Sequence, residues 1–294
     1  MKKRRSMIAA AVLSVILLCL CGCKGTEPKR EPSVQSVTIG ETTMEYLHFG
    51  NKDGEAFVIL PGLSLKSVMG SADGIKARYA LLAETYDVYL FDHIAREPEG
   101  YTIDDMARDT LAAFDAAGLK CVHLMGVSMG GMVAQTIAAN APERVSSLIL
   151  CSTAMSGAYR STDAFEAWER YAAERNTPAL AEAFGAYVYT PSFFEQYRDA
   201  IIAACEGATE LDFRNFAISA AAIRGFDVSD RIGTVACPAF VLGAGEDRVL
   251  GVQASYDLID ALHCDGYIYE GYGHGAYDEA PDYVERIAAF LKGE

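Results

Sequence analysis

The stretch Met125-Gly126-Val127-Ser128-Met129-Gly130-Gly131 decides the fold of this chain. An apolar run at 121–125 indicates a buried strand before it, and a second run at 132–139 indicates a helix after it. Ser128 therefore lies at a strand-to-helix turn, with a glycine two residues before it and another two residues after it. A side chain at either glycine would collide with the neighbouring strand or helix. The pattern predicts an exposed hydroxyl beside a helix N-terminus, where the next backbone N–H faces any developing negative charge.

An ordinary glycine-rich connection between a strand and a helix could have the same sequence. The two interpretations are distinguished by the rest of the chain. The residues before the stretch predict an N-terminal hairpin, 34–39 with 42–49. Further apolar strands are predicted at 56–60, 88–92, 145–151, 238–243 and 267–270, and helices at 75–84, 102–118, 252–262 and 281–291. This alternation predicts an α/β fold with a doubly wound, mostly parallel sheet.

Strand patterns disappear between about 152 and 232, which predicts a helical cap inserted into the sheet domain. Four helical stretches are expected there, at 165–174, 179–189, 192–205 and 213–224. The aromatic residues of this segment either line a substrate pocket or pack inside the insertion, and packing is expected for most of them. They are Trp168, Tyr171, Phe184, Tyr187, Tyr189, Phe193, Phe194 and Tyr197.

The N-terminus has the pattern of an export signal. Four basic residues, 2–5, precede an apolar run at 7–20 that is too short for a comfortable transmembrane helix. The sequence Leu20-Cys21-Gly22-Cys23 then resembles the bacterial lipobox. The resemblance implies a signal peptide at 1–22, diacylglyceryl on Cys23 and a tether at 23–33, so that the protein is lipid-anchored to the bacterial membrane outside the cytoplasm. An uncleaved N-terminal anchor is the alternative.

Composition limits the possible partners of the chain. Its 294 residues are 51% hydrophobic, so 34–294 can form one large domain, and the formal net charge of −15 argues against nucleic acid. Five cysteines beyond the leader are scattered singly and are expected to be small buried hydrophobes, with a disulfide between Cys237 and Cys264 left open. Neither a phosphate-binding loop nor a paired histidine motif occurs, so no metal or organic cofactor is expected.

A serine hydroxyl needs a base, and the base needs a carboxylate that fixes its tautomer. His274 is the best base, because its glycine-rich loop follows the last predicted strand. The other histidines lie in strands, at a strand end or at a helix end: His48, His123, His93 and His263. Asp247 follows the preceding strand and is favoured over its neighbour Glu246 by its spacing from that strand. Serine, acid and histidine then follow the order used by hydrolases of this topology.

Four segments together resemble the α/β-hydrolase fold family, in its branch of small esterases, enol-lactonases and haloperoxidase-like proteins. They are 126–131, the step Pro142-Glu143-Arg144-Val145, 245–249 and 271–274. The resemblance covers about 34–291. It implies that Ser128 is the nucleophile, Asp247 the acid and His274 the base, with oxyanion N–H donors at Leu63 and Met129.

Two departures from the family pattern concern the neighbourhood of this site. Pro61-Gly62 stands where the family commonly has His-Gly, although a backbone donor needs no particular side chain. The segment Asp92-His93-Ile94-Ala95-Arg96-Glu97 replaces a common Asp-x-Arg-Gly-x-Gly turn and changes the pocket wall.

The sequence thus predicts a serine hydrolase that cleaves an ester-like bond of a small molecule through an acyl-enzyme. An acyltransferase or thioesterase would use the same triad, and a noncatalytic ligand-binding lipoprotein is a third reading. Fold does not specify the substrate, and the oligomeric state is also left open.

Overall fold

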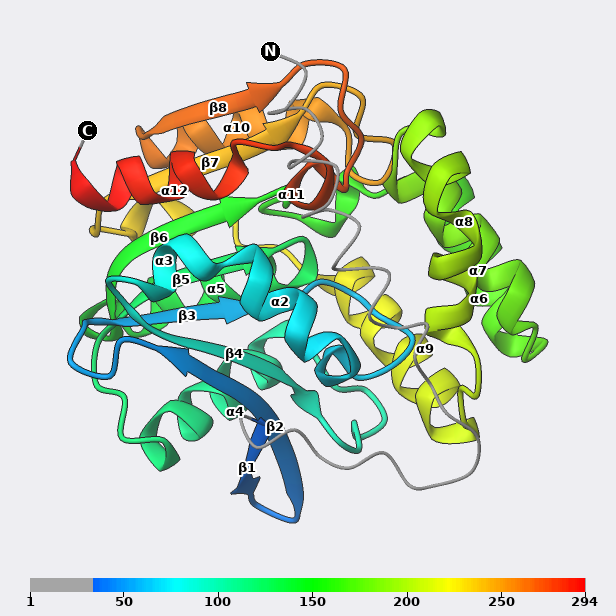
Figure 1. Ribbon diagram of the computed structural model, residues 1–294, viewed down its shortest axis with the longest axis horizontal. Helices are drawn as coiled ribbons and strands as arrows, with labels where there is room; N and C mark the ends of the chain where they lie inside the picture. Colours follow the sequence, from blue (N-terminus) through cyan, green and yellow to red (C-terminus); the bar gives the residue numbers. More distant parts are fainter. Residues whose placement is uncertain (1–33, 294) are drawn as a thin grey trace.

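The computed structural model describes residues 34–293 (Figure 1). The expected signal peptide, the tether and Cys23 lie outside the described residues. One eight-stranded sheet has the order β1-β2-β4-β3-β5-β6-β7-β8. The strands are β1 (Val34–Ile39), β2 (Thr42–Gly50), β3 (Ala56–Leu60), β4 (Asp87–Ile94), β5 (Val122–Val127), β6 (Val145–Cys151), β7 (Ala239–Ala244) and β8 (Asp265–Tyr269). β3 to β8 are parallel and β2 is antiparallel to both of its neighbours, so the predicted α/β fold with a mostly parallel sheet is confirmed.

Strand β3 shows why its sequence is a continuous apolar run. Val58 and Leu60 point into one core, while Phe57 and Ile59 point into the other. Successive side chains of a strand alternate between faces, and both faces of this sheet are covered by helices. The first core contains residues of α4 (Ile103–Ala116), α5 (Met129–Asn140) and α10 (Val252–Leu262), and the second contains residues of α2 (Ala72–Arg78), α3 (Ala80–Ala83) and α12 (Tyr283–Lys292).

Three local predictions differ from the structure. The helix predicted at 75–84 is divided into α2 and α3 at Tyr79, whose ψ of 17° departs from the α-helical value. Strand β4 extends to Ile94, so His93 belongs to a strand rather than to the following loop. Helix α11 (Ala276–Glu279) was not predicted, because four residues are too few to show a helical period.

The cysteines of the described chain are all free, so the disulfide between Cys237 and Cys264 is absent. Cys151 is fully buried, as expected of a small hydrophobe, whereas Cys121 is exposed and the remaining three are half-buried. The fold is therefore held by packing and hydrogen bonds rather than by a covalent crosslink among these residues.

Four helices between β6 and β7 form the helical insertion, which lies on the side of the molecule toward which β3 points (Figure 1). They are α6 (Thr162–Ala173), α7 (Thr177–Val188), α8 (Pro191–Cys205) and α9 (Glu210–Gly225). Each begins slightly before its apolar pattern, because a polar side chain caps its first turn. The capping residues are Ser161, Asn176, Thr190 and Thr209. Within the part of the chain that is described, no helix combines the length and the apolarity needed to cross a membrane.

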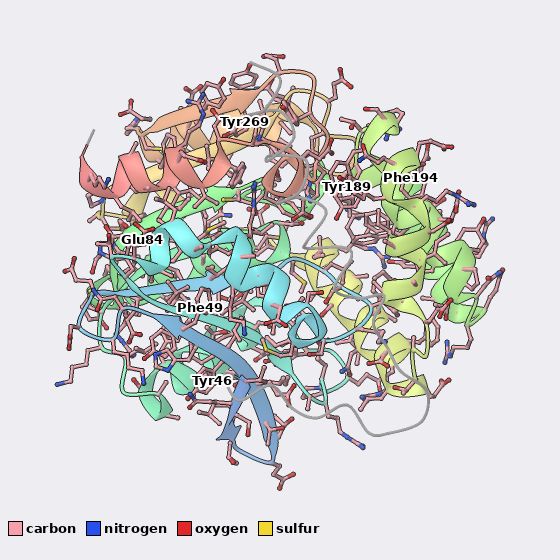
Figure 2. The ribbon with its side chains drawn as sticks, viewed as in Figure 1. Tyr46, Phe49, Glu84, Tyr189, Phe194 and Tyr269 are labelled. Carbon is pink, nitrogen blue, oxygen red and sulfur yellow. The ribbon has the colours of Figure 1, made fainter. Side chains whose placement is uncertain are left out.

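The insertion is tied to the segment that follows β8. The N–H of Gly275 donates to the carbonyl of Val188 at 2.7 Å. Tyr189 donates its hydroxyl to Asp278 at 2.9 Å, and Thr190 donates its hydroxyl to Glu279 at 2.6 Å. Figure 2 shows Tyr189 at the edge of the insertion that faces the sheet. The loop that contains His274 is thus held from the side of the insertion as well as from the sheet.

Asp278 should make the stability of this junction pH-dependent. Burial raises the pKa of its carboxyl, opposed by the hydrogen bond from Tyr189 and the charge of Arg78. The folded state therefore retains this proton at pH values where the unfolded state has lost it, and the contribution of Asp278 to stability falls as the pH rises above about 4. Asp278→Asn keeps an acceptor for Tyr189 and removes the titration. We expect its free energy of unfolding, relative to wild type, to increase from pH 4 to pH 7 in urea titrations. A difference that does not change with pH would contradict this.

Candidate active site

Ser128 occupies the strained turn that the sequence predicts. Its φ of 52° and ψ of −117° are rare for a residue with a side chain, and its N–H donates to the carbonyl of Cys151 at 2.8 Å. A Cβ at Gly126 would lie 2.4 Å from the carbonyl oxygen of Gly130, and one at Gly130 would lie 2.2 Å from that of Leu60. Both glycines are therefore required by the close approach of strand β3, the turn and helix α5.

The variant Gly130→Ala should measure this steric requirement. The added methyl overlaps a strand carbonyl that cannot move without breaking the sheet, so we expect a loss of about 2–4 kcal/mol of unfolding free energy. Gly70→Ala is the matched control, because a Cβ there meets nothing within 4 Å, and its effect should stay within about 0.5 kcal/mol. Urea unfolding of both variants gives the comparison, and equal stability of the two would contradict it.

The three side chains predicted for catalysis meet in one hydrogen-bonded chain. The Ser128 Oγ lies 3.0 Å from Nε2 of His274, and Nδ1 of His274 lies 2.8 Å from Oδ2 of Asp247. An ionised carboxylate only accepts, so Nδ1 carries the hydrogen and Nε2 is left to accept the serine proton. The side chains of His274 and Asp247 are each only 3% exposed, which keeps water out of this hydrogen bond.

The surroundings of Asp247 favour its ionised form. Its second oxygen accepts from the backbone N–H groups of Val249 at 2.7 Å and Leu250 at 2.9 Å. Burial raises the pKa of this carboxyl, but the charge of His274 and these hydrogen bonds outweigh burial and hold the pKa below its ordinary value. A carboxylate beside His274 stabilises the positive imidazolium that forms when the ring takes a proton.

The alternatives weighed in the sequence lie away from this chain of hydrogen bonds. Glu246 is exposed and is not the partner of His274. His48 contacts Asp87 at 2.7 Å, and His123 contacts Ser147 at 2.9 Å. His263 is the C-terminal cap of α10. The remaining histidine, His93, has its Nε2 3.2 Å from the carbonyl oxygen of Gly62.

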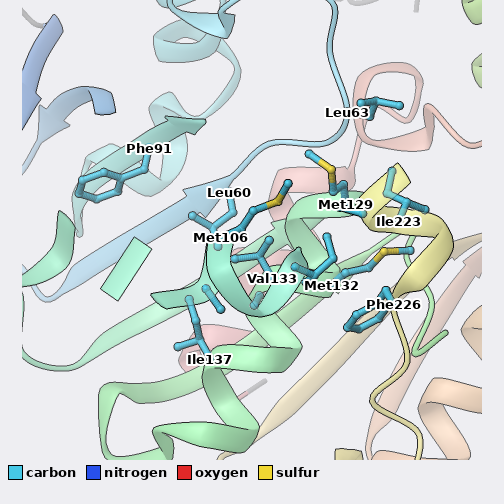
Figure 3. Close-up of a cluster of buried hydrophobic side chains, with 14 of the residues drawn as sticks. Leu60, Leu63, Phe91, Met106, Met129, Met132, Val133, Ile137, Ile223 and Phe226 are labelled. Carbon is cyan, nitrogen blue, oxygen red and sulfur yellow. The ribbon is translucent and has the colours of Figure 1, made fainter. Parts of the chain in front are cut away.

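The resemblance assigns the oxyanion hole to the backbone N–H groups of Met129, which directly follows Ser128, and Leu63, which lines the cavity beside it. Met129 is the first residue of α5, so its N–H has no acceptor within the helix. Leu63 follows β3 and lines the same cavity as Ser128 and His274. Figure 3 shows the side chains of Leu63 and Met129 among the buried hydrophobic residues of this region. Among the described residues, no hydrogen bond is donated by the Leu63 N–H. The preceding Gly62 is close to the serine, because a Cβ on it would lie 3.1 Å from Ser128 Cβ.

The cavity at the triad is small and mostly apolar, with a volume of about 20 Å³. Trp168 and Phe184 of the insertion line it, together with Phe165. Other aromatic residues of the insertion pack against one another or against Trp168: Tyr187 contacts Trp168, and Phe193 contacts Tyr197. The indole N–H of Trp168 is buried without a partner in the described structure. A larger hollow of about 730 Å³ lies between α4, α6 and α9 and includes none of the triad residues.

Two arginines hold the loops that contain Asp247 and His274. The sequence predicts this role for neither of them. Arg248 donates to the carbonyls of Ala186 and Tyr189, which joins the loop of Asp247 to the end of α7. Arg78 donates to the carbonyls of Tyr277 and Ala280 and holds the segment after His274. Their partners are backbone carbonyls of residues distant in sequence, which no local pattern reveals. Within 34–293, no group of three or more His, Cys, Asp or Glu side chains is placed to hold a metal ion.

A buried Ser–His–Asp chain at a strand-to-helix turn of such a sheet defines the class of α/β hydrolases. The chain belongs to the family described as alpha/beta hydrolase fold, whose model matches residues 55–281.

Proteins with similar sequences or structures include ones named as hydrolases and as lactonases. A putative carbamate hydrolase, RutD of Variovorax paradoxus, is 29% identical over 234 residues, which cover 74% of this chain and 84% of the relative. The 3-oxoadipate enol-lactonase 2 of Acinetobacter baylyi is 23% identical over 232 residues, covering 77% and 84%. The crystal structure of the enol-lactonase from Burkholderia xenovorans superimposes with a TM-score of 0.74 at 20% identity, covering 88% of this chain and 100% of that one. The structural likeness establishes the fold.

Proposed function

We propose that this protein is a serine hydrolase that cleaves an ester-like bond of a small molecule. The observation that carries the proposal is the hydrogen-bonded chain from Ser128 through His274 to the buried carboxylate of Asp247. The names of the relatives, a putative carbamate hydrolase and an enol-lactonase, support attack on an acyl carbon. The small apolar cavity favours a compact, partly apolar acyl or ring substrate.

In the proposed mechanism, each of these residues takes part in one or more steps. Nε2 of His274 takes the proton of Ser128 as Oγ bonds to the carbonyl carbon, and the carbonyl electron pair moves onto oxygen. The N–H groups of Leu63 and Met129 donate to this oxyanion, each with an effect of roughly 10²–10³ on rate. When the oxyanion collapses, His274 returns the proton to the leaving alcohol or amine. Water, deprotonated by His274, then attacks the acyl-serine, and collapse releases the acid and restores the serine.

Product analysis tests this function against acyl transfer. The purified chain is incubated with nitrophenyl acetate and nitrophenyl hexanoate, with and without added short alcohols. The proposal predicts steady turnover to nitrophenol and the free acid, with the acid remaining the main product when alcohol is present. Esters of the alcohol as main product would indicate an acyltransferase. Absence of turnover of both nitrophenyl esters would contradict the proposal and favour a noncatalytic ligand-binding protein.

We also propose that the protein is a lipoprotein held on the outer side of the bacterial cytoplasmic membrane through Cys23. The support is the sequence around Cys23, since two acyl chains anchor a protein stably. The Cys23→Ser variant, expressed in bacteria with labelled palmitate, should lose the label, whereas Cys21→Ser should retain it. Wild-type protein that incorporates no palmitate would contradict the anchor.

A further inference from the structure

The loop after β3 has an unusual source of side-chain support. Pro61 offers no polar side chain there, but the next strand in the sheet brings His93 to the same place. Its Nε2 lies 3.2 Å from the carbonyl oxygen of Gly62. A carbonyl oxygen can only accept, so Nε2 carries the hydrogen and the imidazole donates to this peptide group.

The orientation of this peptide group matters for the neighbouring serine. The Gly62 carbonyl and the Leu63 N–H belong to one peptide group, and no cis peptide bond occurs among the described residues. In a trans peptide the two bonds point in opposite directions, so a donor on the carbonyl side turns the Leu63 N–H away from His93. Gly62 has wide conformational freedom, and a Cβ on it would lie 3.7 Å from Ser128 Oγ. The hydrogen bond from His93 thus restrains a peptide beside the reacting oxygen whose orientation the backbone of Gly62 itself restricts little.

Two buried carboxyl groups anchor the surroundings of His93. Asp92 accepts from the backbone N–H of His93 at 2.8 Å and from the hydroxyl of Ser67 at 2.6 Å, so it joins β4 to the segment that follows Leu63. Glu97 accepts from the hydroxyl of Ser219 on α9 at 2.8 Å. Burial raises the pKa of both carboxyl groups, while the charge of His93 lowers it. The backbone around His93 is therefore held by hydrogen bonds of Asp92 on the side of the sheet and of Glu97 on the side of the insertion.

We propose that His93 is a positioning residue for the oxyanion hole, which holds the Gly62–Leu63 peptide with its N–H toward the carbonyl oxygen under attack. The inference rests on the proposed hydrolase function and deepens it. His93 takes no proton from Ser128, because His274 occupies that place. A hydrogen bond to the carbonyl also polarises the peptide and strengthens the N–H as a donor. The segment that departs from the family pattern thereby supplies the support that Pro61 lacks.

Two variants of His93 separate orientation of the peptide from mere packing. His93→Phe keeps a ring and removes the donor, whereas His93→Gln places an amide N–H where Nε2 lies. For each, kcat and KM on nitrophenyl acetate are measured, with the second-order rate of fluorophosphonate labelling. His48→Phe is the control, because His48 is also a half-buried strand histidine but lies opposite Tyr89, toward the start of β4.

We expect the loss of the donor to affect the rate of the chemical step more than substrate binding. Because an oxyanion donor acts mainly there, His93→Phe should lower kcat and the labelling rate about tenfold and change KM less than about twofold. His93→Gln should recover most of the loss, and His48→Phe should match wild type. If His93→Phe does not give a native circular dichroism spectrum, His93→Asn, whose amide is too short to reach Gly62, replaces it.

The possible outcomes distinguish this inference from the function on which it rests. Wild-type protein without Ser128-dependent labelling would overturn the proposed function and the role of His93 with it. Ser128-dependent labelling that is equally fast in His93→Phe would overturn the role of His93 alone. Equal losses in the Phe and Gln variants, or a rise in KM with unchanged kcat, would also overturn it, because packing rather than the N–H donor would then account for the effect.

Discussion

Ser128→Ala is expected to abolish fluorophosphonate labelling and to lower kcat on nitrophenyl esters by at least about 10⁴-fold. The alanine removes the only oxygen that lies 3.0 Å from Nε2 of His274 among the described residues. Without that oxygen no acyl-enzyme forms, and the remaining rate reflects binding and the oxyanion donors alone. Stopped-flow or plate assays of nitrophenol release, beside gel detection of the fluorescent probe, give both quantities.

The control for this variant is the neighbouring serine at the end of β6. Ser152 is 1% exposed, and its hydroxyl has no partner in the described structure, so Ser152→Ala makes the same substitution near Ser128 without removing a hydrogen bond. We expect it to retain labelling and a kcat within about threefold of wild type, since changes outside the reacting groups have small effects on rate. Labelling that survives in Ser128→Ala would show that another residue is the nucleophile.

Asp247→Asn should have the second largest effect, a fall in kcat of about 10³–10⁴-fold with little change in KM. One side-chain oxygen of Asp247 accepts two backbone N–H groups and the other accepts from His274. An asparagine can keep only its oxygen on the backbone N–H groups, so its amide N–H₂ faces Nδ1 of His274. Nδ1 must then accept, the ring hydrogen moves to Nε2, and the ring can no longer take the serine proton.

Glu246→Gln is the matched control for Asp247→Asn, because it makes the same change at the adjacent, exposed carboxylate. It should leave kcat within about twofold of wild type. Steady-state kinetics of both variants on one nitrophenyl ester measure the difference. A large loss in Glu246→Gln together with a small loss in Asp247→Asn would reverse the assignment of the acid.

The sequence predicts the fold well wherever short-range patterns determine it. Strand β3 is a continuous apolar run because both of its faces are buried, and the glycines around Ser128 are required by contacts within one strand–turn–helix unit. His274 and Asp247 could be selected because parallel strands place their following loops on one edge of the sheet. These are local or topological rules, and they hold in this chain.

The sequence could not predict contacts that depend on tertiary packing. Tyr79 interrupts a helix that its sequence pattern continues, and its side chain is buried in the core. Arg248 and Arg78 donate to backbone carbonyls that are distant in the sequence. Every residue has a backbone carbonyl, so the residue types do not indicate which ones act as acceptors. His93 could be recognised as a strand-end histidine. Its contact with Gly62 could not be predicted, because it depends on the pairing of β3 with β4 in the sheet.

The location of a covalent adduct tests the central claim most directly. The full chain is treated with a fluorophosphonate at neutral pH and digested, and its peptides are analysed by mass spectrometry. If Ser128 is the nucleophile activated by His274, one phosphonyl group per chain is found on the peptide that contains Ser128, and His274→Ala slows its formation by at least about 10³-fold. An adduct on a different residue, or equal labelling in His274→Ala, would contradict the account.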